Sequence, residues 1–189
     1  MPFWSSGKVE PKRQFRFLVT LAGMEQGATW YAKSATKPGV TVGSTPHAFL
    51  NHTFYYPGKV TWSEVQVVLV DPVNPDATGN LLSILRRAGY NVPGNLNEPD
   101  ATTTIGKGNA TAQLGSVIIR GIDEDGNILE QWTLNNPFIT DVAFNGYDYG
   151  AEDLSDITVK FRYDWAAYEI PETPGRDPGE LVERRLFQA

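Results

Sequence analysis

The sequence predicts a mainly β protein with one helix, folded as an antiparallel β-sandwich or a partial barrel. Residues 156–165 alternate strictly between apolar and polar side chains, which is typical of a strand with one buried face. The apolar residues of this segment are Ile157, Val159, Phe161 and Tyr163. Residues 128–134 and 138–144 are two further β-rich segments, separated by the break Asn135-Asn136-Pro137. Three such segments in close succession indicate an antiparallel sheet.

Length and composition are those of one globular domain with extensions. A chain of 189 residues can bury roughly 70% of its unfolded surface. Its 41% hydrophobic and 20% charged residues exclude wholesale disorder, and 18 glycines and 13 prolines fit a protein of strands and turns. No apolar run approaches the ~20 residues that span a bilayer, and the first residues lack a signal-peptide pattern. We therefore expect no membrane anchor and assembly in a cytoplasm.

Charge is distributed unevenly along the chain. The formal net charge is −6. Residues 1–90 carry nine Lys/Arg and five Asp/Glu, whereas residues 91–189 carry seven and seventeen. An acidic protein is a poor candidate for reading nucleic-acid sequence, which needs a basic face. The asymmetry is compatible with subunits that meet through unlike surfaces, and equally with ordinary solvation.

The N-terminal half contains an N-terminal extension, a first strand, a long excursion and a second strand. Residues 1–13 are polar and basic, so we expect an exposed arm. Residues 14–22 alternate as a strand, whereas residues 24–56 form a loose excursion or hairpin outside the core, ending in an aromatic patch. Pro57-Gly58 predicts a turn. Residues 60–70 then predict one long strand, whose second half is apolar on both faces as in a central strand.

One helix is predicted between residues 74 and 89. Asn74 is a good N-cap, Pro75 suits the first helical position, and Gly89 is the expected residue after the C-terminus. Arg86 and Arg87 favour the last turn of a helix. The apolar stripe comprises Ala77, Leu81, Ile84, Leu85 and Ala88.

The remaining segments are loops and strands. Residues 91–112 predict a polar loop, and residues 114–123 a strand. The acidic turn 123–127 lacks the spacing of a calcium loop, so a solvated hairpin is the preferred interpretation. After Tyr168 the chain is rich in Pro and Gly, and we expect the C-terminal extension, residues 169–189, to dock on a neighbouring molecule.

No catalytic, cofactor or metal signature is present in the sequence. Cysteine is absent, which excludes thiolate chemistry and disulfides. His47 and His52 lie five residues apart with no acidic residue close by, so neither a metal site nor a Ser-His-Asp arrangement is predicted. We therefore predict a protein that is not an enzyme and needs no cofactor.

Several segments, in their order along the chain, resemble the tail tube proteins of contractile-tailed bacteriophages, a family related to type VI secretion inner-tube proteins. The residues that carry the resemblance are Phe54, Pro57 and Gly58 before a strand, Trp132, Asn136, Pro137 and Phe138 at the break, Tyr147-Asp148-Tyr149, and the ending Tyr163, Asp164 and Trp165. The similarity covers a β domain of residues 14–168. The excursion 24–56, the loop 91–112 and the extension 169–189 fit less well.

The resemblance implies a structural protein of the virion tail, assembled in the host cytoplasm. Six copies would close into a ring whose strands join a continuous inner barrel, and stacked rings would form a hollow conduit for DNA ejection. Lys160 and Arg162 would then face the lumen or a neighbour. Expected partners are the chain itself, sheath, tape-measure, baseplate and tail-terminator proteins. Viral DNA would pass without sequence-specific binding, because an acidic wall repels phosphates.

Two other functions compete with this interpretation. The inner tube of a type VI secretion system or of an extracellular contractile injection system would share the fold and the ring. A carbohydrate- or ligand-binding β-sandwich belongs to a different class, in which Trp30, Tyr31, Tyr55 and Tyr56 would supply stacking platforms. A sheet enzyme is third, and the residue inventory argues against it.

Overall fold

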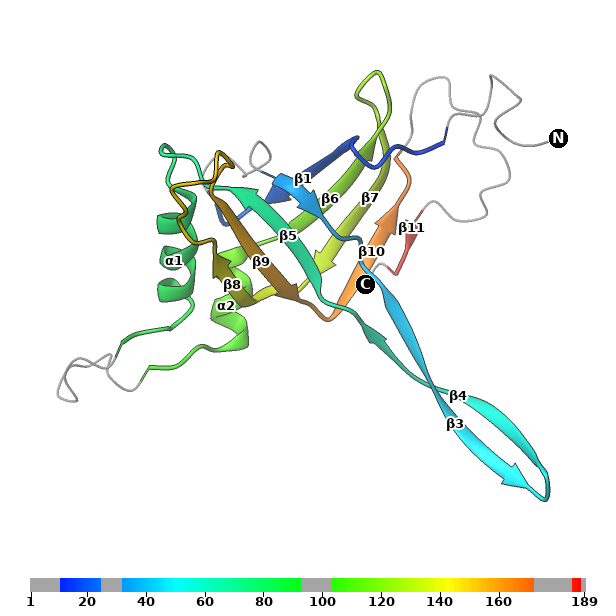
Figure 1. Cartoon of the computed structure of the whole chain (residues 1–189). Helices are drawn as coiled ribbons and strands as arrows, with labels where there is room; N and C mark the ends of the chain where they lie inside the picture. The colour runs from blue at the N-terminus through cyan, green and yellow to red at the C-terminus, as the bar shows by residue number, and fades with distance from the viewer. Residues whose placement is uncertain (1–10, 25–31, 93–102, 172–184, 188–189) are drawn as a thin grey trace.

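The computed structural model describes residues 11–24, 32–92, 103–171 and 185–187, which form two packed β-sheets, two helices and a projecting hairpin (Figure 1). The predicted mainly β architecture of antiparallel strands is confirmed. The described strands do not close into a barrel within one chain.

The larger sheet has five strands in the order β1-β6-β7-β10-β11, and all neighbouring pairs are antiparallel. Its strands are β1 (Phe17–Leu21), β6 (Val117–Ile122), β7 (Ile128–Asn135), β10 (Trp165–Glu169) and β11 (Arg185–Leu186). The first predicted strand is confirmed as β1, which pairs with β6 about a hundred residues further along, as Val19 opposite Ile119 shows.

The smaller sheet has four strands in the order β2-β5-β9-β8 and is also antiparallel. Its strands are β2 (Ala32–Ala35), β5 (Val65–Val70), β9 (Asp156–Arg162) and β8 (Phe138–Phe144). The central strands β5 and β9 bury alternate residues, as a period of two requires. The alternation predicted for residues 156–165 is therefore confirmed over β9.

The core lies between the two sheets and beneath the helices. The larger sheet contributes Val19, Leu21, Val117, Ile119, Leu134 and Ala166. The smaller sheet contributes Val65, Val67, Leu69, Ile157, Val159 and Phe161. Burial of these aliphatic and aromatic side chains on both inner faces is the main source of stability of such a sandwich.

Helix α1 (Ala77–Arg87) confirms the predicted helix but begins later than expected. The N-cap is Asp76 rather than Asn74, because the Asp76 carboxylate accepts a hydrogen bond from the backbone N–H of Gly79 at 3.0 Å. Gly89 has φ of 113°, as expected for a residue that ends a helix. Of the predicted stripe, Ala77, Leu81, Ile84 and Ala88 are buried. Leu85 is only half-buried.

A second helix, α2 (Lys107–Leu114), corrects the predicted count of one helix and shortens the predicted polar loop 91–112. The helix is short and weakly amphipathic, and its buried residues Ala110 and Leu114 lie one turn apart. Gly115, with φ of 68°, ends it. The strand predicted from residue 114 therefore starts three residues later, at Val117. Residues 93–102 of the predicted loop lie outside the described part of the chain.

The chain passes between the sheets at two adjacent turns. The break at Asn135-Asn136-Pro137 carries it from β7 in the larger sheet to β8 in the smaller sheet. Residues 163–164 carry it back from β9 to β10, so the predicted strand 156–165 is divided between two sheets. Asn136 adopts a φ of 51°, which Asn tolerates better than most residues.

Strands β3 (Val40–Phe49) and β4 (His52–Trp62) form a hairpin that projects from the sandwich, and we call it the arm (Figure 1). Residues 40–56 of the predicted excursion 24–56 lie outside the core, but its beginning does not: Met24 is buried in the core, and Ala32 and Ala35 of β2 pack against it. The prediction of a turn at Pro57-Gly58 is wrong, because both residues lie within β4 at a register shift opposite Gly43. Such β-bulges accept proline and glycine inside a strand. The predicted strand 60–70 is divided at Ser63-Glu64 between β4 and β5.

The described end of the chain folds back on its own domain. Strand β11 pairs with Tyr168 and Glu169 of β10. The Phe187 ring lies 5.8 Å from that of Trp62 in an edge-to-face arrangement. These described residues contact their own domain, and docking of the extension on a neighbouring molecule stays a prediction. Residues 172–184 and 188–189 of the predicted extension, and residues 1–10 of the predicted N-terminal arm, lie outside the described residues.

Candidate assembly surface

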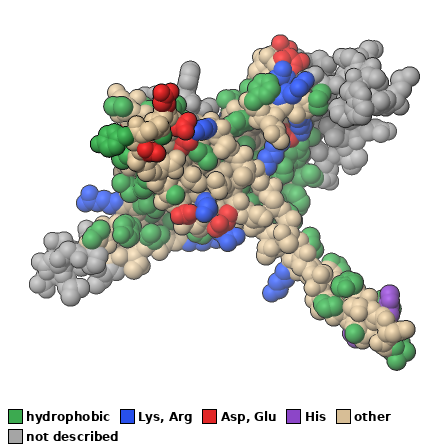
Figure 2. All heavy atoms as spheres, in the orientation of Figure 1, with side chains coloured by type: hydrophobic (Ala, Val, Ile, Leu, Met, Phe, Trp, Pro, Cys, Tyr) green, Lys and Arg blue, Asp and Glu red, His purple; other side chains and the backbone are tan. Residues whose placement is uncertain are grey.

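The arm is an apolar surface with no partner strand among the described residues. Every residue of β3 and β4 is exposed except Trp62. The large apolar side chains along it are Val40, Val42, Phe49, Leu50, Phe54, Tyr55, Tyr56 and Val60. Figure 2 shows these side chains spread over the arm, with the histidines near its end. Unpaired strand edges and exposed apolar residues in such number are typical of a surface that another chain covers.

The arm makes a poor metal or glycan site. His47 pairs across the hairpin with Phe54, and the His52 ring packs edge-on against Phe54 at 4.7 Å. Tyr55 and Tyr56 are consecutive strand residues, so their rings point to opposite faces and form no common stacking platform. Trp30 and Tyr31, the other residues of the glycan hypothesis, lie outside the described residues.

The two turns between the sheets are held together by Asp164. Its carboxylate accepts hydrogen bonds from the Lys107 ammonium at 2.7 and 2.8 Å and from the Asn136 side-chain amide at 2.8 Å. The Asp164 backbone N–H donates to the Asn135 carbonyl at 3.0 Å. The hydrogen bond from Lys107, followed by that from Asn136, lowers the pKa of Asp164. This cluster joins α2 to both turns.

Six of the residues singled out by resemblance gather at these turns. They are Asn136, Pro137, Phe138, Tyr163, Asp164 and Trp165. Pro137 and Tyr163 are buried, and Trp165 pairs with Asn135 across the strands. Trp132 lies apart on β7, with its ring 4.7 Å from Tyr168.

The remaining three residues of that set, Phe54, Pro57 and Gly58, are on the arm. The turn residues therefore shape the sandwich, whereas the arm residues belong to the exposed surface.

Lys160 and Arg162 lie on the outer face of the smaller sheet and take part in ion pairs. The Lys160 ammonium is 2.8 Å from the Asp141 carboxylate, and the Arg162 Nε is 3.5 Å from the Glu64 carboxylate. The hydrogen bond to Asp141 raises the pKa of Lys160. This face thus presents charges of both signs rather than a basic patch.

Glu130 is a buried carboxylate that the sequence analysis missed. It is 4% exposed and forms ion pairs with Lys12, which precedes β1, and with Lys37, three residues before the arm. Burial by itself raises the pKa of Glu130, but the hydrogen bonds from the two lysines outweigh it and leave the pKa lowered. The sequence did contain a signal for this buried carboxylate. Glu130 and Leu134 are four residues apart on β7 and therefore lie on the same, inward-facing side of the strand.

The described residues contain no group of three or more His, Asp or Glu side chains that could hold a metal ion. The Asp123 carboxylate of the acidic turn is used locally: it accepts from the backbone N–H groups of Asp125 at 2.9 Å and Asn127 at 2.7 Å. This supports the hairpin interpretation of residues 123–127. In the described part of the chain, no helix has the length and hydrophobicity to cross a membrane.

No family model and no curated protein matches the sequence, but solved structures with the same fold exist. A chain of the anti-feeding prophage baseplate matches with a TM-score of 0.61 and 14% identity, covering 85% of this chain and 96% of that one. A chain of the sheath–tube complex of an extracellular contractile injection system, PVC, matches with a TM-score of 0.60 and 13% identity, covering 85% and 93%. A chain of the anti-feeding prophage tube-terminating cap matches with a TM-score of 0.60 and 13% identity, covering 90% and 100%.

These matches cover nearly the full length of the known chains, so the whole fold is shared rather than a fragment. At 13–14% sequence identity, these matches show the fold but assign no role to individual residues. The chain therefore has the fold of components of the anti-feeding prophage and of an extracellular contractile injection system.

Proposed function

We propose that this chain is a structural subunit of a contractile-tail tube, which self-assembles into stacked rings of six copies around a hollow conduit. The observation that carries the proposal is the shared fold over 85–90% of this chain with components of tube, baseplate and cap assemblies. A non-enzymatic role agrees with it, because the described polar clusters consist of ion pairs that hold segments together.

The exposed arm supports self-assembly. Its two strands have ten and eleven residues, so it extends for about 30 Å with both outer edges unpaired in the described structure. A soluble monomer rarely leaves so much apolar surface and so many backbone groups open. A closed ring of copies removes such edges without unlimited aggregation.

The acidic balance supports passage of DNA through the tube. With a net charge of −6 per copy, an assembled wall repels phosphates and does not retain the genome. In this proposal the outer face of β9, with Lys160 and Arg162, faces the lumen or a neighbouring copy. The expected partners remain sheath, tape-measure, baseplate and terminator proteins of a virion tail.

A second candidate is the inner tube of an extracellular contractile injection system or of a type VI secretion system. The observation that favours it is that the matching PVC chain comes from a contractile injection system. Neighbouring genes separate the two candidates. Capsid and tape-measure genes beside this one indicate a phage tail, whereas effector and ATPase genes indicate an injection or secretion system.

Electron microscopy of the purified full chain tests the proposal. Negative-stain images at high protein concentration are expected to show rings or tubes, and light scattering a mass of several copies. A chain that remains monomeric at high concentration, with no rings or tubes, would contradict the proposal. Monomers that are also retained by a glycan column would instead support the ligand-binding sandwich.

A further inference from the structure

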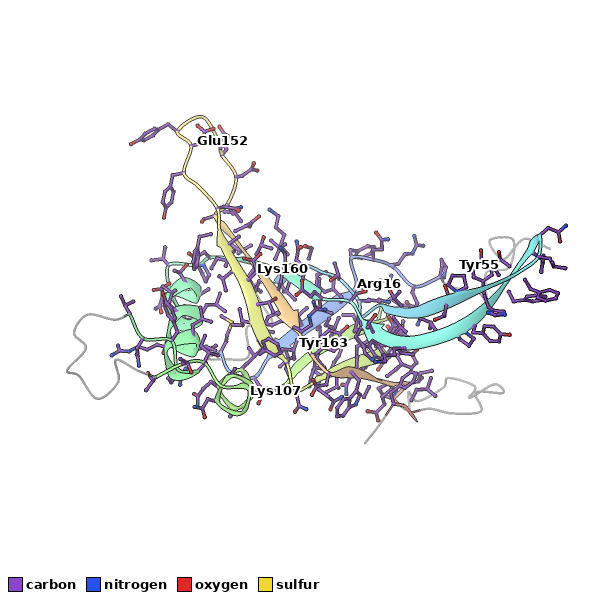
Figure 3. All side chains as sticks on the ribbon, turned by 90° about the horizontal axis from the view of Figure 1, so that it is seen from below. Arg16, Tyr55, Lys107, Glu152, Lys160 and Tyr163 are labelled. Atoms are coloured by element: carbon purple, nitrogen blue, oxygen red, sulfur yellow. The ribbon has the colours of Figure 1, made fainter. Side chains whose placement is uncertain are left out.

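A groove opens where the base of the arm meets α2 and the turn between β9 and β10. Its volume is about 610 Å³, within the range of roughly 300–1,000 Å³ that pockets for well-buried ligands occupy. The uncharged residues that line it include Val60, Trp62, Ile105, Phe138 and Tyr163, and the charged ones are Lys107, Arg162 and Asp164. Figure 3 shows Lys107 and Tyr163 on this side of the molecule.

Tyr163 lies in the wall of the groove. The residue is 4% exposed, its ring lies 6.0 Å from that of Trp62, and its hydroxyl makes no hydrogen bond to any residue that the structure describes. Burial raises the pKa of Tyr163 to about 12, so the hydroxyl stays protonated near neutral pH. The hydroxyl itself is covered, so Tyr163 contributes the edge of its ring to the groove wall rather than a polar contact.

The loop between β8 and β9, residues 145–155, has the chemistry of a suitable occupant. Tyr147, Tyr149 and Leu154 are among the most exposed apolar residues of the described chain. The loop also carries Asp148, Glu152 and Asp153, and it contains no Lys or Arg. An aromatic and acidic segment therefore stands free of the sandwich, as Figure 3 shows at Glu152.

Strand direction places the loop and the groove at opposite ends of the same two strands. β8 starts at Phe138 in the groove and runs to the loop, and β9 returns from the loop to Arg162 at the groove. Seven residues per strand separate them by about 20 Å, so the loop does not reach the groove of its own chain. A second copy displaced by about the length of these strands would bring its loop to the groove of the first. Such a heterologous contact can repeat indefinitely.

Charge favours the loop over the other exposed apolar segment, the tip of the arm. The side chains of Lys107 and Arg162 are 59% and 50% exposed at the groove, although each also has a carboxylate neighbour, Asp164 and Glu64. Residues 45–56 at the end of the arm contain two histidines but no Lys, Arg, Asp or Glu. The tip of the arm would therefore bring no carboxylate to Lys107 and Arg162, whereas the loop brings three.

We propose that this groove is the docking site for the β8–β9 loop of a second copy of the chain. The inference rests on the self-assembly in the proposed function, and it names the two surfaces that meet. Aromatic packing of Tyr147 and Tyr149 against Trp62 and Phe138 provides most of the contact, and the charged groups orient it.

Disulfide trapping tests the contact directly, because the natural chain contains no cysteine. Ala151→Cys in the loop and Thr61→Cys in the groove are combined in one chain; both positions are exposed and both substitutions are small. Mild oxidation of the assembled protein is expected to give a ladder of trimers and larger covalent multimers that a reducing agent reverses. Each single-cysteine variant stops at the dimer, because it can form only one bond per chain.

A matched pair tests the competing occupant. Ala48→Cys near the tip of the arm is combined with Thr61→Cys, and a ladder from this pair in place of the first puts the arm in the groove and overturns the inference. If the protein forms rings or tubes but the Ala151→Cys/Thr61→Cys chain gives no ladder, the inference is wrong and the tube function stands. If the wild type and all variants remain monomeric, the tube function fails as well.

Discussion

Two carboxylates, Glu130 and Asp164, each join segments that are far apart in the sequence. Glu130 binds lysines from the segments that precede β1 and the arm, whereas Asp164 binds α2 and the turn after β7. The two side chains differ in burial: Glu130 is almost inaccessible to solvent, whereas the Asp164 side chain is 35% exposed. Loss of Glu130 should therefore cost more stability than loss of Asp164.

Replacement of Glu130 by Gln is expected to lower the free energy of unfolding by about 1–3 kcal/mol. The two ammonium groups lose their common anion, while the amide stays buried with fewer good partners. Thermal unfolding measures the change. Glu124→Gln on the acidic turn is the matched control, since the Glu124 side chain is 57% exposed where it pairs with Arg16. Equal melting temperatures of the two variants would contradict the proposed importance of Glu130.

Asp164 should contribute stability that depends on pH. Because the folded-state pKa of Asp164 is below its ordinary value, the contribution is complete above the unfolded pKa of about 4 and is lost as pH falls through the folded pKa. Asp164→Asn is therefore expected to be less stable than the wild type at pH 7 by a small margin that shrinks below pH 4. Melting curves between pH 3 and 7 measure it. A difference that does not change with pH would exclude ionisation of Asp164 as its origin.

At the scale of elements, the sandwich depends on strands that end at turns rather than on long continuous strands. The pattern in residues 156–165 and that in residues 60–70 each predicted one strand, and the structure divides both. The alternation of apolar and polar residues does not predict where β9 ends, because it continues through Tyr163 while the backbone passes to the other sheet. Helix α1, by contrast, was predictable because its cap, stripe and final glycine are local signals.

Packing of α1 can be tested with adjacent leucines. Leu81 is fully buried, whereas Leu82 is 50% exposed. Leu81→Ala is expected to cost about 2–5 kcal/mol of stability, because it leaves a cavity under the helix. Leu82→Ala serves as the control, with an expected effect of about 0.5 kcal/mol or less. Chemical denaturation measures both. Similar losses for both variants would show that α1 does not pack as described.

At the scale of the whole molecule, a well-packed sandwich carries an apolar arm that contributes little to its own core. Only Trp62, at the base of the arm, packs against the core. The proposed assembly requires this separation of roles. The sandwich can form its core without the arm, and the arm can then be covered by another copy. The same separation makes assembly and folding independently testable.

Leu50→Asp at the tip of the arm should therefore leave folding intact and abolish or strongly weaken assembly. Leu50 is 91% exposed, so the charge costs little in the monomer, but it is costly where the arm is covered by another chain. Circular dichroism checks the fold, and negative-stain images check for rings or tubes. Val73→Asp, at a residue that is 100% exposed outside the arm, is the control. Normal tubes from Leu50→Asp would show that the tip takes no part in assembly.

The sequence alone was enough to predict a mainly β sandwich, strands β1 and β9 and helix α1, because strand alternation and helix caps depend on residues within a few positions of each other. It also predicted that residues 40–56 of the arm lie outside the core, but it wrongly extended that excursion back to Met24 and β2, which pack in the core. Only the tertiary structure revealed the pairing of β1 with β6, the two turns between the sheets, the Glu130 and Asp164 clusters and the groove. Each of these features depends on contacts between residues that are tens of positions apart in the sequence. A local sequence pattern does not predict which distant segments come into contact.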